Sequence, residues 1–300
     1  EVYTFGTPGS SKSTLSDVTR EDGCFGGLRV YMRSARPGWG AVDTPVYDPV
    51  AWITQQFSYR HARMRFLELW ELNLYQGSIS PCSASIQDPP SDTFWWIEGH
   101  VSYEAALKHH LQAAKQALPQ DLKAATSELN DLQKAYLMCH FTFVIYAPEM
   151  ATLHVDAKEW GWTLVGYASS LPSEPRDDNS IVTFHDHAAL FQHPRSLECV
   201  LAFEGSDRAD LSDWVYDAEI APVTFCGFTE VHRGFKEKLM AMLESEDFDQ
   251  AIRVKLPYCS KLITAGHSMG GAQAELFSAC ANRHRPDHDM AALKDQKLVT

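Results

Sequence analysis

The stretch Leu262–Gly271, which reads LITAGHSMGG, joins an apolar run to a glycine-rich turn, and a helical pattern follows from Ala272 to Asn282. A strand, a G-x-S-x-G turn and a helix in this order are typical of a nucleophile elbow, where glycines permit a strained turn. The helix N-terminus then points toward the serine hydroxyl and stabilises negative charge that develops there. This context predicts Ser268 as a catalytic nucleophile rather than as part of a structural turn.

The residues that follow Ser268 are poor candidates for its acid and base. They include His284 and His288, with Asp287 and Asp289 beside the second histidine, in a polar run typical of a surface loop. An acid and a base adjacent in sequence do not easily line up with one serine. We therefore expect both partners to come from the part of the chain before Ser268.

The first seventy residues supply a candidate acid and a candidate base. Asp48 lies in a loop that follows an apolar, strand-like run, and His61 lies on a later loop. Acid and then base is the order that α/β-hydrolases show after their serine. The chain therefore runs Asp48, His61, Ser268, which is a cyclic shift of the order Ser, Asp, His. Asp43, in the same loop as Asp48, is the alternative acid.

Several separated stretches form a set of motifs. They are Val2–Pro8 (V-x-T-F-G-x-P), Asp48–Val50 (D-P-V), Tyr59–His61 (Y-x-H), Leu201–Ser206 with Asp213 and Trp214 (F-R-G-[ST]…D-W), Val231–Phe235 (V-H-x-G-F) and Gly266–Gly271 (G-H-S-[LM]-G-G). Together they resemble the class 3, or fungal-lipase-like, lipases, in which the strand resembling Val2–Pro8 comes after the elbow. Three departures concern the expected pocket wall and remove no catalytic group: Glu204 stands where the family usually has Arg, Gly9–Ser11 replaces its R-V-G, and Ala51–Trp52 follows D-P-V where Pro-Arg is common.

The resemblance implies an α/β-hydrolase fold, with a central, mostly parallel sheet flanked by helices, in a circularly permuted order. It implies a catalytic triad of Ser268, His61 and Asp48, and an oxyanion hole formed by Ser206 and the backbone N–H of Met269. The implied activity is serine ester hydrolysis of acylglycerols or related lipids through an acyl-enzyme, without a cofactor or a metal ion. The short, acidic segment after Ser206 resembles a lid region and predicts only transient contact with a lipid interface.

Other interpretations stay open at this point. A short-chain or feruloyl-type esterase would use the same triad, because the pocket walls separate it from a lipase. A catalytically silent, hydrolase-like binding module would tend to lose one triad residue, whereas all three are present. The chain could also be a fragment whose halves belong to different sites. The motif order fits a circular permutant, a window across two tandem repeats, or an order introduced when the sequence was assembled.

Composition narrows the classes of partner. The net charge of −13 and a pI of about 5.4 argue against nucleic-acid binding and against electrostatic docking to anionic membranes. The sequence has no run of eighteen apolar residues, so we expect no transmembrane helix. The seven cysteines, an odd number without a C-x-x-C pair, are interpreted as mostly free and buried, which favours a cytoplasmic over a secreted protein. His185, His187 and His193 lack a further ligand at a known spacing, so we expect no metal site.

The chain length fits one domain. With 300 residues, 45% of them hydrophobic, the chain can bury the core of a single α/β domain spanning residues 1–300. The Gly-, Ser- and Pro-rich range 75–99 is predicted to be a linker, and Ser102–Tyr136 to be helical with a break at Pro119. The other predicted elements are a helix at Val231–Ser245, strands or buried segments at Phe141–Tyr146 and Trp162–Tyr167, and a strand at Leu197–Phe203.

Overall fold

The computed structural model describes residues 1–8, 10–16, 19–35, 45–47, 60, 62–70, 79–83, 94–95, 103–146, 150–170, 186–205 and 221–282. Asp43, Asp48, His61 and Ser206 lie outside these residues, as does the lid-like segment 207–214. Ser268 and Met269 lie within them.

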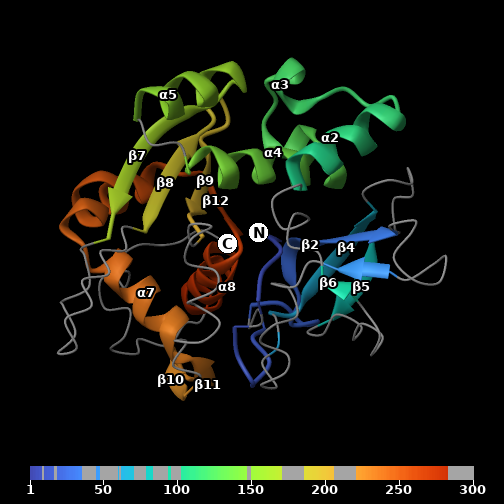
Figure 1. Ribbon diagram of the computed structural model, residues 1–300. Helices are drawn as coiled ribbons and strands as arrows, with labels where there is room; N and C mark the ends of the chain where they lie inside the picture. Colours follow the sequence, from blue (N-terminus) through green and yellow to red (C-terminus); the bar gives the residue numbers. More distant parts are fainter. Residues whose placement is uncertain are drawn as a thin grey trace.

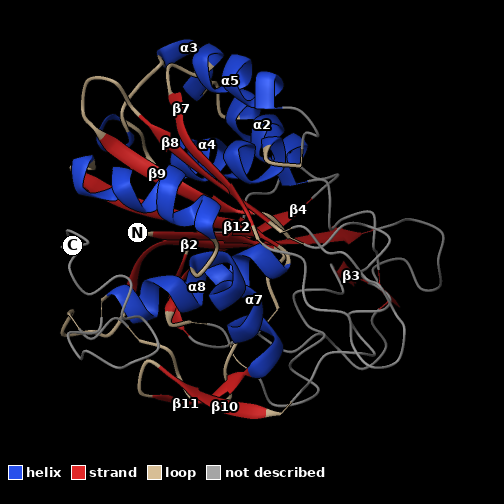
Figure 2. Ribbon diagram, turned by 90° about the vertical axis from the view of Figure 1, so that its left-hand side faces the viewer, coloured by secondary structure: helices blue, strands red, loops and turns tan. Residues whose placement is uncertain are grey.

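A large, mostly parallel sheet forms the centre of the molecule (Figures 1 and 2). Its main strands lie in the order β5-β4-β2-β1-β12-β9-β8-β7, and β3 pairs with β2 and β6. All pairings between β4 and β9 along this order are parallel, whereas β5, β8 and β7 add antiparallel edges. The strands are β1 (Val2–Phe5), β2 (Phe25–Ala35), β3 (Pro45–Tyr47), β4 (Met64–Trp70), β5 (Ser80–Ser83), β6 (Phe94–Trp95), β7 (Thr163–Ser169), β8 (His187–Gln192), β9 (Glu198–Phe203) and β12 (Lys261–His267). Two of them, β5 and β6, fall inside the range predicted as a linker.

Helices cover both faces of this sheet (Figure 2). One layer contains α2 (Tyr103–Ala113), α3 (Pro119–Leu122), η3 (Thr126–Glu128), α4 (Asp131–Val144) and α5 (Met150–Glu159). The other contains α7 (Arg233–Leu243) and α8 (Met269–Ala281), beside the antiparallel hairpin of β10 (Pro222–Phe225) and β11 (Phe228–His232). The short helices η4 (Phe248–Ile252) and η5 (Arg253–Tyr258) lead to β12. None of the described helices is long and apolar enough to cross a membrane.

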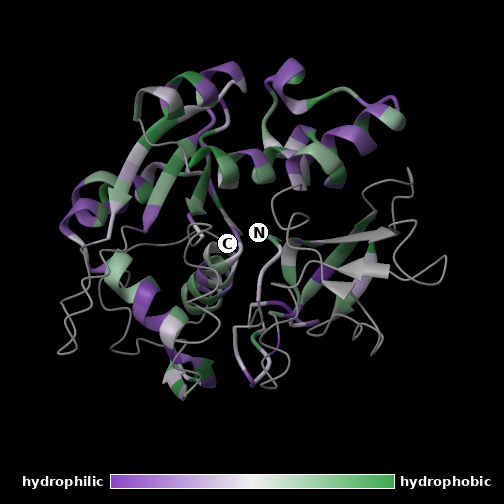
Figure 3. Cartoon of the chain, viewed as in Figure 1, coloured by the Kyte–Doolittle hydropathy of each residue, from purple (hydrophilic) through white to green (hydrophobic). Residues whose placement is uncertain are grey.

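The two helical layers enclose two separate hydrophobic cores. Side chains alternate across a strand, and along β9 Val200 packs into the core under α4, whereas Leu201 and Phe203 pack into the core under α8. All six residues of β9 are buried, which explains why Cys199–Phe203 is a continuous apolar run. In Figure 3, which is coloured by hydropathy, the buried strand β9 is hydrophobic, whereas helix α3 at the periphery is largely hydrophilic. The expected α/β-hydrolase architecture is therefore confirmed.

The first and the last described strands are neighbours at the centre of the sheet. Val2 pairs with Thr264 and Phe5 pairs with His267, both in parallel register. Helix α8 leaves the end of β12 and packs on the same face as Val2 of β1. A strand, a helix and a neighbouring parallel strand form the usual crossover unit of a parallel sheet. Here β1 occupies the position that follows α8 in that unit, so the strand order is cyclically shifted relative to the chain.

The segment Phe141–Tyr146, expected to be a strand or a buried segment, does not form a strand: Phe141–Val144 complete helix α4, and two turn residues follow. The helix begins at a capping box in which the Asn130 side chain accepts from the N–H of Gln133, and the Gln133 side chain accepts from the N–H of Asn130. Most of α4 is buried, because it packs between the sheet and α2. A helix buried on most sides loses the apolar periodicity that distinguishes it from a buried strand.

Other sequence predictions agree with the structure at least in part. Leu197–Phe203 corresponds to β9 and Trp162–Tyr167 falls largely in β7. The predicted helix at Val231–Ser245 begins two residues late, because Val231 and His232 complete strand β11. The predicted break at Pro119 is confirmed, since Pro119 starts the short helix α3.

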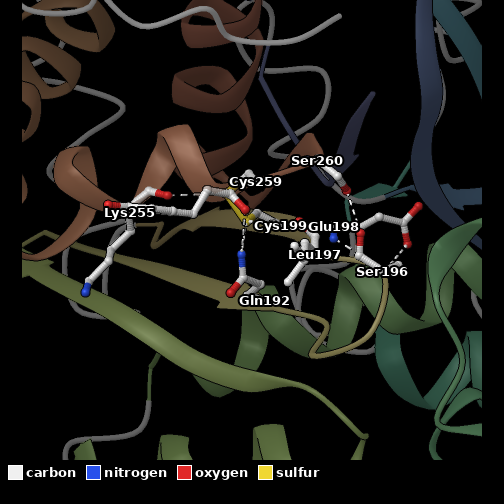
Figure 4. Close-up of a disulfide and its surroundings, with 9 residues drawn as sticks. Gln192, Ser196, Leu197, Glu198, Cys199, Lys255, Cys259 and Ser260 are labelled. Atoms are coloured by element: carbon white, nitrogen blue, oxygen red, sulfur yellow. Dashed lines mark hydrogen bonds between the residues drawn. A yellow bond between two sulfur atoms is a disulfide. The ribbon is translucent and has the colours of Figure 1, made fainter.

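The cysteines correct a second expectation, because six of the seven form disulfides. The pairs are Cys24–Cys82, Cys199–Cys259 and Cys226–Cys280, and the buried Cys139 stays free. The interpretation of mostly free cysteines was wrong because partners 54 to 60 residues apart meet only through the sheet topology. Figure 4 shows the pair Cys199–Cys259 at the start of β9, where Gln192 lies beside it.

This pairing predicts the number of free thiols. After denaturation without a reductant, we expect a thiol reagent to modify about one cysteine per chain, and mass spectrometry to locate it at Cys139. Denaturation with a reductant should raise the number to seven. A Cys139→Ser variant, as the control, should lose the signal obtained without reductant. Modification of several cysteines before reduction would contradict the pairing.

Candidate active site

Ser268 occupies a sharp turn between β12 and α8. Its backbone dihedrals are φ 54° and ψ −128°, which a residue with a Cβ adopts only at a cost in strain. Two hydrogen bonds hold the turn: the N–H of Ser268 donates to the carbonyl of Phe5 at 2.9 Å, and the N–H of Gly271 donates to the carbonyl of Ser268 at 3.0 Å. Strand β1 therefore contributes directly to the conformation of the predicted nucleophile.

Gly266 allows the end of β12 and the start of α8 to lie close together on the two sides of this turn. A Cβ at this position would collide with the backbone of Gly270 in the first turn of α8. The strand before Ser268 and the helix after it therefore approach each other more closely than a side chain would allow. This geometry confirms the strand, tight turn and helix that the G-x-S-x-G motif predicts.

The end of β9 lies next to the elbow and is held there by Tyr146. The N–H of Gly205 donates to the Tyr146 hydroxyl at 2.9 Å, and this hydroxyl lies 3.1 Å from Nδ1 of His267. A Cβ added at Gly205 would lie 2.6 Å from the His267 carbonyl oxygen and 3.0 Å from Cβ of Ser268. Tyr146 thus connects the backbone that leads to Ser206 with the residue before the nucleophile.

Two of the three histidines in the resemblance motifs, His232 and His267, have packing roles. The ring of His267 lies 4.6 Å from that of Phe143 and is almost fully buried. His232 stacks on Phe235 at 4.1 Å, and burial lowers its pKa from 6.5 to about 4. A histidine that is enclosed and neutral, as His232 is, is suited to packing.

The N-terminal turn of α8 lies directly beside Ser268. Met269 is the first residue of this helix, and the N–H groups of a first turn have no acceptor within the helix. The helix dipole adds partial positive charge at the same point. Negative charge that develops on an atom near Ser268 is therefore stabilised from this side.

Both chain neighbours of His61 are placed, although His61 itself lies outside the described residues. The N–H of Arg60 donates to the carbonyl of Ser11 at 2.7 Å, and the N–H of Ser10 donates to the carbonyl of Arg60 at 2.8 Å. The N–H of Ala62 donates to Oε2 of Glu275 on α8 at 3.0 Å. The segment that carries the predicted base is therefore attached to the elbow helix.

Glu204, which stands where the related motif usually has Arg, pairs with a neighbouring strand. Its Oε2 lies 2.6 Å from Nδ1 of His187 and accepts from the N–H of His187 at 3.1 Å. The ring of Tyr167 stacks on His187 at 5.3 Å, and burial together with the charge of Glu204 raises the pKa of Tyr167 to about 12. The sequence analysis considered His187 only as a metal ligand, which it did not expect, and it did not predict the pair of His187 with Glu204.

A metal site finds no support among the described residues, where no group of three or more His, Cys, Asp or Glu side chains could hold an ion. His187 begins β8, whereas His193 follows its last residue and is bonded to Ser196 at 3.0 Å. The two histidines thus lie at opposite ends of one strand.

The sheet, its two helical layers and the strained serine define an α/β-hydrolase fold. Residues 200–300, which include β9, the elbow and α8, match the family model described as Lipase (class 3). This match confirms the resemblance to the class 3 lipases over residues 200–300. The related motifs in the first 61 residues lie outside the matched range, and no curated protein matches the chain.

Solved lipase structures from Rhizomucor miehei are similar to parts of this chain. The native lipase–propeptide complex has 21% identity over 51% of this chain and 48% of its own, with a TM-score of 0.36. The triacylglyceride lipase has 19% identity over 56% of this chain and 58% of its own, with a TM-score of 0.37. This chain therefore spans about half the length of the structures that it matches.

Replacing Tyr146 tests the connection between β9 and the elbow. Tyr146→Phe removes the acceptor of the Gly205 N–H, and leaving such a group unsatisfied costs about 1 to 3 kcal/mol of unfolding free energy. Urea titration should show this loss. Tyr258→Phe is the control, because Tyr258 is 70% exposed and its hydroxyl can be replaced by water. Equal stability of both variants would contradict the proposed link.

The buried His232 predicts a dependence of stability on pH. Burial lowers the pKa of His232 in the folded chain from the ordinary value of 6.5 to about 4. Between about pH 4 and pH 6.5, His232 therefore binds a proton in the unfolded chain but not in the folded chain. Stability contributed at neutral pH is therefore lost as the pH falls from about 6.5 to 4, by about 3 kcal/mol. His232→Phe should show a correspondingly smaller loss in urea titrations at pH 7 and pH 4. Parallel losses in both proteins would contradict this account.

Proposed function

We propose that the chain is a serine ester hydrolase that cleaves acylglycerols or related lipid esters. The observation that carries this proposal is Ser268 at a positive φ, between a buried parallel strand and a helix N-terminus, inside the range that matches the class 3 lipases. A strained serine in this position would direct its hydroxyl toward an ester at the carboxyl edge of the sheet, and Ser268 is buried in this structure. Sites of open α/β sheets lie at this same edge.

The proposed triad is Ser268, His61 and Asp48. In the acylation step, Oγ of Ser268 attacks the ester carbonyl and His61 takes the hydroxyl proton. When the tetrahedral intermediate collapses, His61 returns this proton to the leaving alcohol and the acyl group stays on Ser268. Water that is activated by His61 then releases the fatty acid. Asp48 would orient His61 and stabilise its charged form, with Asp43 as the alternative acid.

The proposed oxyanion hole combines two segments of the sheet edge. The N–H of Met269 would donate from the first turn of α8, and Ser206 would donate from the segment that follows Gly205. The placement of Gly205 beside Ser268 supports this pairing, because Ser206 is the next residue in the chain. Removal of one such donor typically costs about 3 kcal/mol of transition-state stabilisation.

A lipid ester fits the composition better than a charged substrate. With a net charge of −13, the protein would repel anionic ligands at neutral pH, so contact with the acyl chain would be apolar. A short-chain or feruloyl-type esterase would use the same triad, and a silent binding module would use none of its chemistry. The dependence of activity on acyl-chain length separates these alternatives.

The test is hydrolysis of p-nitrophenyl esters from acetate to palmitate. The wild-type chain should be active with a preference for longer acyl chains, whereas Ser268→Ala should lose activity by at least a factor of about 10³. Ser278→Ala is the control, because Ser278 lies on the same helix and bonds to Thr264 away from the elbow. Its turnover should match that of the wild type.

The other outcomes are equally informative. A preference for acetate would favour the short-chain esterase, and a folded but inactive wild type would favour the silent module. Activity that persists in Ser268→Ala would refute the proposed nucleophile.

A further inference from the structure

We infer that Glu275, together with Ser10 and Arg29, is a positioning device that fixes the base-carrying segment relative to the nucleophile. The inference rests on the proposed function, because it takes His61 as the base. It assigns a role to a buried carboxylate and a buried guanidinium that the proposed chemistry does not otherwise use.

Glu275 lies in α8 and binds two segments of the chain. Its Oε2 accepts from Oγ of Ser10 at 2.8 Å and from the N–H of Ala62 at 3.0 Å. Ser10, Ala62 and Glu275 are all fully buried. Hydrogen bonds to a buried carboxylate are stronger than those between neutral groups, so these contacts resist displacement of Ala62.

Arg29 of β2 holds the other side of the same peptide residue. Its Nη2 donates to the carbonyl of Ala62, and its side chain is almost completely buried. Burial lowers the pKa of Arg29 to about 10. Burial also raises the pKa of Glu275, while the charge of Arg29 acts in the opposite direction. Glu275 therefore binds the N–H of Ala62 and Arg29 binds its carbonyl, and the charge of each of these two side chains affects the pKa of the other.

The chain on the other side of His61 is held by the same loop that supplies Ser10. Arg60 pairs with Ser11 in an antiparallel bridge, and Ser11 also bridges to Val231 of β11. Arg60 is therefore attached to residues 10–11 and through Ser10 to Glu275, to which Ala62 bonds directly. Neither Arg60 nor Ala62 can shift without breaking these hydrogen bonds.

Helix α8 makes this attachment relevant to Ser268. Glu275 comes seven residues after Ser268, which is about two helical turns, so both residues lie near one side of the helix. A helix is a stiff connection over this distance. The Glu275 carboxylate therefore fixes Ala62, and through Ser10 also Arg60, relative to the helix that begins at the nucleophile.

Stability alone gives a weak reason for such a device. Burying two charged groups costs several kcal/mol each in desolvation, and apolar residues of similar volume often give equal or better stability. A misplacement of about 1 Å in a catalytic group, by contrast, can cost on the order of 100-fold in rate. Precise placement of the base is therefore the stronger explanation for these residues.

The experiment compares two single hydroxyl deletions, one at the contact with Glu275 and one at a separate contact of helix α8. Ser10→Ala removes one buried hydrogen bond to Glu275, and Ser278→Ala removes one buried hydrogen bond to Thr264. We expect Ser10→Ala to lower kcat by about 10-fold with little change in KM, and Ser278→Ala to leave kcat unchanged at a comparable fall in Tm. Glu275→Gln retains an acceptor oxygen and should keep more activity than Glu275→Leu.

A double-mutant cycle with His61→Ala distinguishes positioning from general destabilisation. If Ser10 acts through the base, Ser10→Ala should have no further effect on kcat once His61 is alanine. If it acts only through stability, its effect should be the same in both backgrounds, and the inference is overturned. Equal kcat values for Ser10→Ala and wild type at 25 °C would overturn it as well.

The same set separates this inference from the proposed function. Loss of activity in Ser268→Ala and His61→Ala, with unchanged kcat in Ser10→Ala and Glu275→Gln, would leave the hydrolase intact and remove only the positioning role. Full activity in Ser268→Ala or His61→Ala would instead remove the proposed triad on which the inference rests.

Discussion

The parallel pairing of β1 with β12 is the constraint on which the rest of the site depends. Ser268 adopts a backbone conformation that is unfavourable for any residue with a Cβ, and the carbonyl of Phe5 accepts its N–H. The elbow is therefore stabilised by a strand from the opposite end of the chain. Helix α8 follows from this arrangement, because it packs across both strands and closes the core on that face of the sheet.

Three further segments are attached to the elbow or its helix, two by hydrogen bonds and one by a disulfide. Tyr146 at the end of α4 brings Gly205 next to Ser268, and Glu275 brings Ala62 to α8. The disulfide Cys226–Cys280 joins the β10–β11 hairpin to the last turn of the same helix. The apolar cores bring these elements together without fixing them to a fraction of an ångström, since hydrophobic burial is not directional. The hydrogen bonds of Tyr146 and Glu275 and the disulfide Cys226–Cys280 fix how these elements are oriented relative to one another.

The sequence predicted those parts of the fold and the site whose signals are local. The elbow was predictable because a strand, a glycine turn and a helix occupy adjacent residues around Ser268. The helical state of Phe141–Val144 was not predictable, because a helix buried on most sides has no apolar stripe. The disulfides and Glu275 were missed for a common reason. Their partners, such as Cys226 for Cys280, are distant in sequence and meet only in the assembled sheet.

Helix α8 connects the parts of the candidate site, because three of them are attached to it. Its first residue follows the serine held by β1, its middle carries the carboxylate that binds Ala62, and its end is bonded to the hairpin. Two of these three attachments come from the first 62 residues, outside the range that matches the class 3 lipases. The cyclic shift in strand order is compatible with a complete site for this reason, since a parallel sheet places strands by pairing rather than by chain order. The geometry around Ser268 is consequently a property of the whole sheet, and residues 200–300 alone lack the strand that holds the elbow in its strained conformation.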